Sequence, residues 1–247
     1  IKADIREPGI GIPEINFKTP DWLKQILIFT KRDLLSKISD KQYLTVTLLE
    51  APILAFFLAF LIRYFDESVK DSTYTLFENS NLPVYIFMSV IVAIFMGLTV
   101  SAEEIIKDRK ILKRESFLNL SWNSYLMSKV TVQFAISAIQ ALTFVLVGNG
   151  ITGIRGMTFE YWLVLFSCWS GANVLGLVIS DSFKTVVTIY ILIPFLVIPQ
   201  IILSGVMVKF EKLNPNISSP SSIPFYGEFI TARWGYEALA VNQFIYN

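Results

Sequence analysis

The sequence predicts an all-α integral membrane protein. Hydrophobic residues make up 53% of the 247-residue chain and charged residues 17%, whereas soluble domains carry about 25% charged residues. Five apolar stretches are each near the roughly 20 residues that a helix needs to cross a bilayer core, at residues 44–62, 84–100, 125–147, 161–179 and 186–208. Because five is an odd number of spans, we expect a sixth span beyond Asn247.

A block of charge separates the second and third expected spans. Nine of the thirteen residues from 103 to 115 are charged. Glu103 and Glu104 lie four and three residues before Lys107, a spacing that supports a helix, which we expect over 102–116. Charge this dense is expelled from hydrocarbon. The mixed charge favours a docking surface for a soluble partner, and the plainer alternative is a solvated loop.

The N-terminal part is expected to lie at the membrane surface. Residues 1–18 contain Pro8, Gly9, Gly11 and Pro13, which indicate a linker. Residues 19–41 then repeat apolar side chains at helical spacing with lysines between them, a pattern typical of an amphipathic interfacial helix. A surface helix of a soluble domain would share this pattern. Since the chain begins with Ile1 and has no signal-peptide core, we expect a longer polypeptide.

Lysine and arginine are distributed unevenly between the expected loops. Residues 1–42 hold eight of them and the loop at 101–123 holds five, whereas six are spread over three segments of the opposite side. The positive-inside rule therefore predicts a cytoplasmic N-terminus. It also predicts that residues 209–247 form an external segment before the sixth span.

The composition excludes several kinds of site. The chain has no histidine and one cysteine, Cys168, so we expect no catalytic or metal site in it. No P-loop pattern occurs, which means that this chain does not bind ATP in that way. A net charge of +1 predicts no nucleic-acid partner.

Several polar or helix-breaking residues interrupt the expected spans. Glu50 would cost about 2.5–3.5 kcal/mol at bilayer depth, so it either faces protein or water, in a transport path or at a neighbouring helix, or reaches the interface. We expect interhelical hydrogen bonds from the amides, which are Gln133, Gln140, Asn173 and Gln200. Small residues four apart predict close packing at Ser167/Gly171 and Ala172/Gly176. The fifth span carries Pro194 and Pro199, which bend a helix and either border a substrate path or are ordinary span prolines.

Two motifs resemble a known family. The charged block reads AEEIIKDRKILKRE at 102–115 and is followed by Leu120-Ser121, Ser124-Tyr125-Leu126 and Ser128-Lys129. Near the C-terminus the chain reads SGVMVKF at 204–210, RWGYEAL at 233–239 and NQF at 242–244. In this order the motifs are similar to those of the membrane domains of subfamily G (white/pleiotropic-drug-resistance-like) ABC transporters, and the charged block is most similar to bacterial, Bacteroidetes-type members.

The resemblance implies roles for these segments. Residues 19–41 would connect an upstream ATP-binding domain, which would hold ATP and Mg²⁺, to the first span. The helix at 102–116 would couple to that domain through Glu103, Glu104, Lys107, Arg109, Lys110, Lys113, Arg114 and Glu115. A dimer would enclose a substrate cavity between spans two and five, with candidate lining residues Phe87, Ile91, Val92, Phe95, Ile198, Ile201 and Ile202. Asn173 and Pro194 are further candidates for the substrate path.

The expected function is therefore the membrane-spanning permease domain of an ATP-driven exporter for lipid-like or amphipathic substrates, in the bacterial inner membrane. Its partners would be membrane lipid, an ATP-binding domain on the same or a separate chain, and a second copy. The alternative is a scaffold or anchor subunit that docks a partner through the same charged helix and transports nothing.

Overall fold

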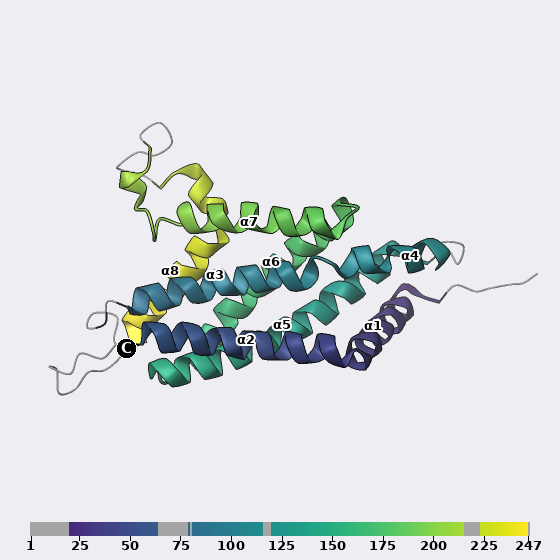
Figure 1. Ribbon diagram of the computed structural model, residues 1–247, viewed down its shortest axis with the longest axis horizontal. Helices are drawn as coiled ribbons and strands as arrows, with labels where there is room; N and C mark the ends of the chain where they lie inside the picture. Colours follow the sequence, from purple (N-terminus) through teal and green to yellow (C-terminus); the bar gives the residue numbers. More distant parts are fainter. Residues whose placement is uncertain (1–19, 64–78, 80, 116–119, 215–222, 247) are drawn as a thin grey trace, which may run out of the picture.

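The computed structural model describes residues 20–63, 79, 81–115, 120–214 and 223–246 (Figure 1). The expected linker at 1–18 lies outside these ranges. Within them every regular element is helical, which confirms the all-α prediction. The α-helices are α1 (Trp22–Ser39), α2 (Lys41–Ile62), α3 (Leu82–Ser101), α4 (Glu104–Glu115), α5 (Trp122–Thr152), α6 (Thr158–Ser182), α7 (Val186–Ile202) and α8 (Thr231–Tyr246). Two short 3-10 helices, Phe210–Lys212 and Phe225–Phe229, lie between α7 and α8.

Four helical stretches among the described residues are long and apolar enough to cross a membrane. They are α2, α5, α6 and the 34-residue run Leu82–Glu115 that joins α3 to α4. The fifth apolar helix, α7, has 17 residues and is shorter than the expected span at 186–208. Beyond Ile202 the chain turns, and Gly205 takes a φ of 79° that favours glycine. The predicted span ran past the end of the helix because residues 203–208 are also largely apolar.

Helix α3 lies at the centre of the bundle and packs most extensively against α6. A Cβ atom on Gly97 would lie 2.5 Å from the backbone oxygen of Trp169, and one on Gly176 would lie 3.1 Å from that of Leu98. These glycines let the two backbones approach closely. The small pair Ala172/Gly176 therefore packs as expected, whereas Ser167 and Gly171 are exposed on the other side of α6.

Helix α2 has one face turned into the bundle and one turned outward. Ala51, Ala55 and Ala59, four residues apart, are fully buried. The opposite side exposes large apolar side chains, among them Leu49, Ile53, Phe56, Phe57, Phe60 and Leu61. In a protein of this composition, such a face suits contact with lipid.

Helix α8 returns to the bundle and packs against α3 and α6. Leu239 and Gln243 are fully buried, and the Tyr161 hydroxyl donates a hydrogen bond of 2.9 Å to Gln243 Oε1. This helix was not expected from the sequence, because polar residues interrupt its apolar face. The structure gives the buried glutamine an internal partner.

We expect that Gly97→Leu separates α3 from α6, since no side chain fits where the added Cβ already meets backbone and Ala172. Such overpacking costs about 1–3 kcal/mol or more. Thermal denaturation of the detergent-solubilised protein should show a lower Tm. The matched control is Gly171→Leu, because a Cβ on Gly171 meets nothing within 4 Å. Equal Tm values for the two variants would contradict the packing described.

Candidate functional site

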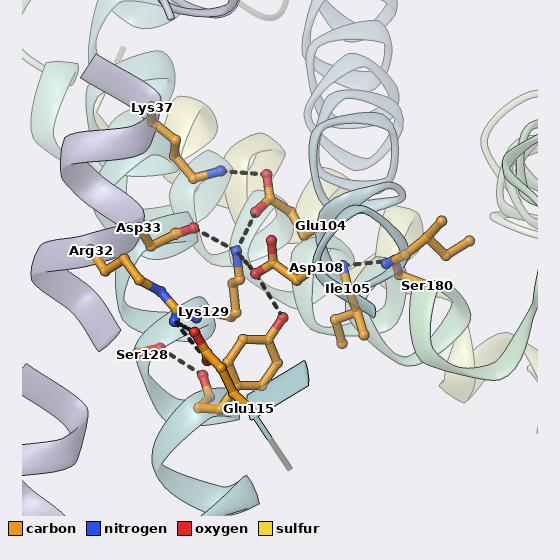
Figure 2. A network of polar contacts seen from close by, with 12 residues as sticks. Arg32, Asp33, Lys37, Glu104, Ile105, Asp108, Glu115, Ser128, Lys129 and Ser180 are labelled. Atoms are coloured by element: carbon orange, nitrogen blue, oxygen red, sulfur yellow. Dashed lines mark hydrogen bonds and ion pairs between the residues drawn. The ribbon is translucent and has the colours of Figure 1, made fainter. Parts of the chain in front are cut away.

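A lysine in an apolar helix holds together three elements that are distant in sequence. Lys129 of α5 is 3% exposed, and its Nζ lies 2.5 Å from Asp33 of α1, 3.2 Å from Glu104 and 2.9 Å from Asp108, both of α4. Figure 2 shows the ammonium among the three carboxylates. A buried charge requires partners of this kind. Lys129 therefore fixes α1 and α4 to the same end of α5.

The network extends from Glu104 to a second lysine of α1. Lys37 forms an ion pair with Glu104, and its Nζ lies 3.3 Å from the Tyr43 hydroxyl. Burial alone would lower the pKa of Lys37, but the attraction of Glu104, with smaller contributions from Tyr43 and Asp33, raises that pKa above its ordinary value. Lys37 consequently stays protonated at neutral pH and adds a second cation to the cluster.

The N-terminus of α4 is fixed to α6 by hydrogen bonds. The backbone amides of Ile105 and Ile106 donate to Ser180 Oγ at 3.1 and 3.3 Å. These amides belong to the first turn of the helix, where no intrahelical acceptor exists. The Arg109 guanidinium donates to the backbone oxygens of Ser180 and Asp181 at 3.1 and 2.5 Å. These oxygens lie at the C-terminus of α6, the end of a helix that attracts cations. Ser180 of α6 therefore supplies the hydrogen-bond acceptor that an N-cap residue would supply for α4.

The other end of α4 is held by a more exposed pair. Arg32 of α1 donates to both carboxylate oxygens of Glu115 at 2.8 Å (Figure 2). The side chains are 40% and 28% exposed, so this pair contributes less than about 1 kcal/mol. It adds a second contact between α4 and α1, at the far end of α4 from the Lys129 cluster.

The eight residues predicted to couple the chain to a partner therefore divide into two groups. Glu104, Arg109 and Glu115 form ion pairs or hydrogen bonds with α1, α5 or α6. Glu103 accepts a hydrogen bond of 2.7 Å from the Tyr190 hydroxyl of α7 and pairs with Lys107. The basic residues on the outer side of α4 are exposed, and these are Lys107, Lys110, Lys113 and Arg114.

A cavity of about 630 Å³ lies beside this junction. Its walls come from α2, α3, α4 and α7, and they include Glu50, Phe95, Glu103, Glu104 and Tyr190. It is bordered by Glu104, the α4 residue that belongs to the ion cluster of Lys129. Of the residues predicted for a substrate path, this cavity includes Phe95.

The other residues predicted for a substrate path lie in separate places. Phe87 and Ile91 are buried in the core, and Val92 is partly buried against it. Asn173 is fully buried, and its amide donates to Ser137 Oγ of α5 at 2.5 Å. On α7, Pro194, Ile198 and Ile202 are exposed and Ile201 is half-buried. These exposed α7 residues form a separate apolar face on this chain.

Three of the four intramembrane amides form the expected bonds between helices, Asn173 among them. The buried side chain of Gln133 has no hydrogen-bond partner among the described residues, so the prediction fails there. Gln140 donates from α5 to the Thr47 backbone oxygen of α2 at 2.7 Å. Gln200 of α7 accepts from the Ala232 amide of α8 at 3.0 Å. Both bonds are of the interhelical kind that the sequence led us to expect.

Sequence reasoning missed most of the buried cluster. It named Glu104 but not Asp33, Lys37, Asp108 or Ser180, because these residues look like ordinary surface positions of amphipathic or loop segments. Lys129 carried a usable signal, since a lysine four residues into an expected span requires a counter-charge. The sequence did not indicate which carboxylates would supply it.

We expect that Lys129→Met leaves three carboxylates clustered without their central cation. Removing one partner of a buried ion pair costs about 3–5 kcal/mol, so the variant should lose monodispersity or show a strongly reduced Tm in detergent. Lys110→Met is the matched control, because Lys110 is exposed on α4. A Lys129→Met protein as stable as this control would contradict the role assigned to the cluster.

Comparison with known proteins agrees with this architecture. Residues 24–244 match the ABC-2 type transporter family. The chain is 21% identical over 249 aligned residues to the ABC transporter G family member STR of Medicago truncatula, an alignment that covers 99% of this chain and 28% of that protein. It is 29% identical over 157 residues to the ABC transporter ATP-binding/permease protein Rv1747 of Mycobacterium tuberculosis, which covers 60% of this chain and 17% of that protein. The chain therefore belongs to the ABC-2 type transporter family and is a membrane domain of that family.

Proposed function

We propose that this domain is the permease part of an ATP-driven exporter for lipid-like or amphipathic compounds. An ATP-binding domain, on the same or a separate chain, would bind ATP and Mg²⁺ and dock on α4. The N-terminus would lie in the cytoplasm, in bacteria at the inner membrane, and two copies would form the transporter. Support comes from the family match, and from the mycobacterial relative, whose name joins an ATP-binding part to a permease.

The observation that carries this proposal is the way in which α4 is held. Its inward side is bound to α1, α5 and α6 through Lys129, Arg32 and Ser180. Its outward side presents exposed basic residues. A helix attached so firmly on one side and exposed on the other is suited to receive a partner and to pass on its movement.

The attachments define the route of that movement. Because α4 follows α3 after a turn at residues 102–103, a push on α4 reaches α3 through the backbone. The same push reaches α5 through Lys129 and α6 through Ser180. When the ATP-binding domains close, α3, α5 and α6 would consequently move with α4 as one body and change the space between the two copies of the chain.

We expect that the double variant Lys110→Glu/Arg114→Glu lowers ATP-driven transport roughly tenfold or more, because like charges across an interface suppress docking. Folding should not change, since both side chains are exposed. Transport of a fluorescent amphiphile into inverted vesicles measures the effect, with Tm as the folding check.

The matched control is Lys209→Glu/Lys212→Glu, which reverses two exposed lysines that follow α7. It should transport at the wild-type rate. Normal transport by the α4 variant would exclude α4 as the docking surface. An absence of ATP-driven transport by the wild-type complex would instead favour the scaffold or anchor subunit.

A further inference from the structure

We propose that the cavity beside α4 binds the cationic headgroup of an amphipathic compound, with Glu50 as the counter-charge. The inference deepens the proposed function and rests on it, because it assigns a chemical class to the compound that the transporter recognises.

Among the acidic residues of the wall, Glu50 is the one without a partner in the described part of the chain. Among the other acids of the wall, Asp40 accepts the Tyr43 amide at the start of α2, Glu103 pairs with Lys107 at 2.6 Å, and Glu104 is bound by Lys129. Within the described part of the chain, the Glu50 carboxylate takes part in no hydrogen bond or ion pair. It lies in the apolar part of α2 and is half-buried.

The wall as a whole carries an excess of negative charge. It contains four carboxylates, from Asp40, Glu50, Glu103 and Glu104, and one cation, from Lys107. Lys37 and Lys129 offset Glu104 from behind the wall. Among the residues that the structure describes, neither Asp40 nor Glu50 has a cation partner. Asp40 accepts the Tyr43 amide, which leaves the charge of Glu50 without a partner of either kind. A carboxylate at this depth is expensive unless a cation or water meets it, so a bound cation would stabilise it.

The rings and apolar side chains around Glu50 suit an amphiphile with a positively charged end. Tyr43, Phe95 and Tyr190 line the same cavity, and aromatic faces attract ammonium groups. Val46 and Val100 complete an apolar part of the wall. Val46 is also exposed on α2, as is Leu49, so an alkyl chain leaving the cavity would meet the outward apolar side of this helix.

An occupant of this cavity would also lie against the coupling helix. Glu103, Glu104 and Lys107 belong to both the wall and the start of α4. Binding at Glu50 is therefore placed to influence the position of α4.

The test measures equilibrium binding without nucleotide, with the complete transporter in phosphatidylcholine nanodiscs. The probe is radiolabelled dodecyltrimethylammonium, and its net-neutral counterpart is dodecyldimethylamine oxide, an amphiphile with a headgroup of similar size, used at pH 8. After subtraction of empty nanodiscs, the wild-type protein should bind the cationic probe roughly tenfold more tightly than the neutral one, a difference of about 1.4 kcal/mol. Glu50→Gln should abolish this preference.

Two further variants keep the result interpretable. Glu50→Asp retains the charge and should retain the preference for the cationic probe. Glu211→Gln, the same chemical change at an exposed site after α7, should bind both probes as the wild type does. Equal binding of the two probes by the wild type, or an unchanged preference in Glu50→Gln, would overturn the proposal.

The outcome is separable from that of the proposed function. If the complex drives ATP-dependent export of another compound but shows no preference for the cation, the proposed function stands and the cation site is excluded. If the complex shows the Glu50-dependent preference but no ATP-driven transport, the cation site stands and the proposed function is excluded.

Discussion

The buried ion cluster around Lys129 is the interaction on which the rest of the structure depends. Other contacts also link α1, α4 and α5, such as the pair between Arg32 and Glu115 at the far end of α4, but the Lys129 cluster is the one that joins all three. In this cluster, a single ammonium joins Asp33, Glu104 and Asp108 and turns α1, α4 and α5 into one unit. Burial makes such a cluster costly when it is incomplete, so its members are mutually dependent.

The parts of the fold that depend on composition and period were predictable from sequence. The charge density at 103–115 indicated a helix outside hydrocarbon, and α4 forms there. Apolar runs indicated α2, α3, α5 and α6 as spans. The end of α7 was placed too late, because hydropathy carries no information about the backbone turn after Ile202. Helix α8 was missed because internal hydrogen bonds, such as that of Gln243, satisfy polar groups that look solvent-exposed in the sequence.

The candidate site was only half predictable for a related reason. The residues of α4 could be named because they are contiguous. Their partners could not, because Asp33, Lys129 and Ser180 are brought to α4 by the packing of other helices. That packing also decides which side of α4 is free, and it leaves Lys110 and Arg114 outward while Glu104 is buried. It further places Glu50 in the wall of a cavity that α4 borders.

The central claim, that α4 receives an ATP-binding domain, is tested most directly by site-specific photo-crosslinking in native membranes. Benzoylphenylalanine would replace Lys110 on α4 or, as the control, the exposed Phe225 between α7 and α8. The account predicts crosslinked peptides from an ATP-binding domain at position 110 and none at position 225. Lipid adducts alone at position 110, in a complex that contains the ATP-binding domain, would contradict it.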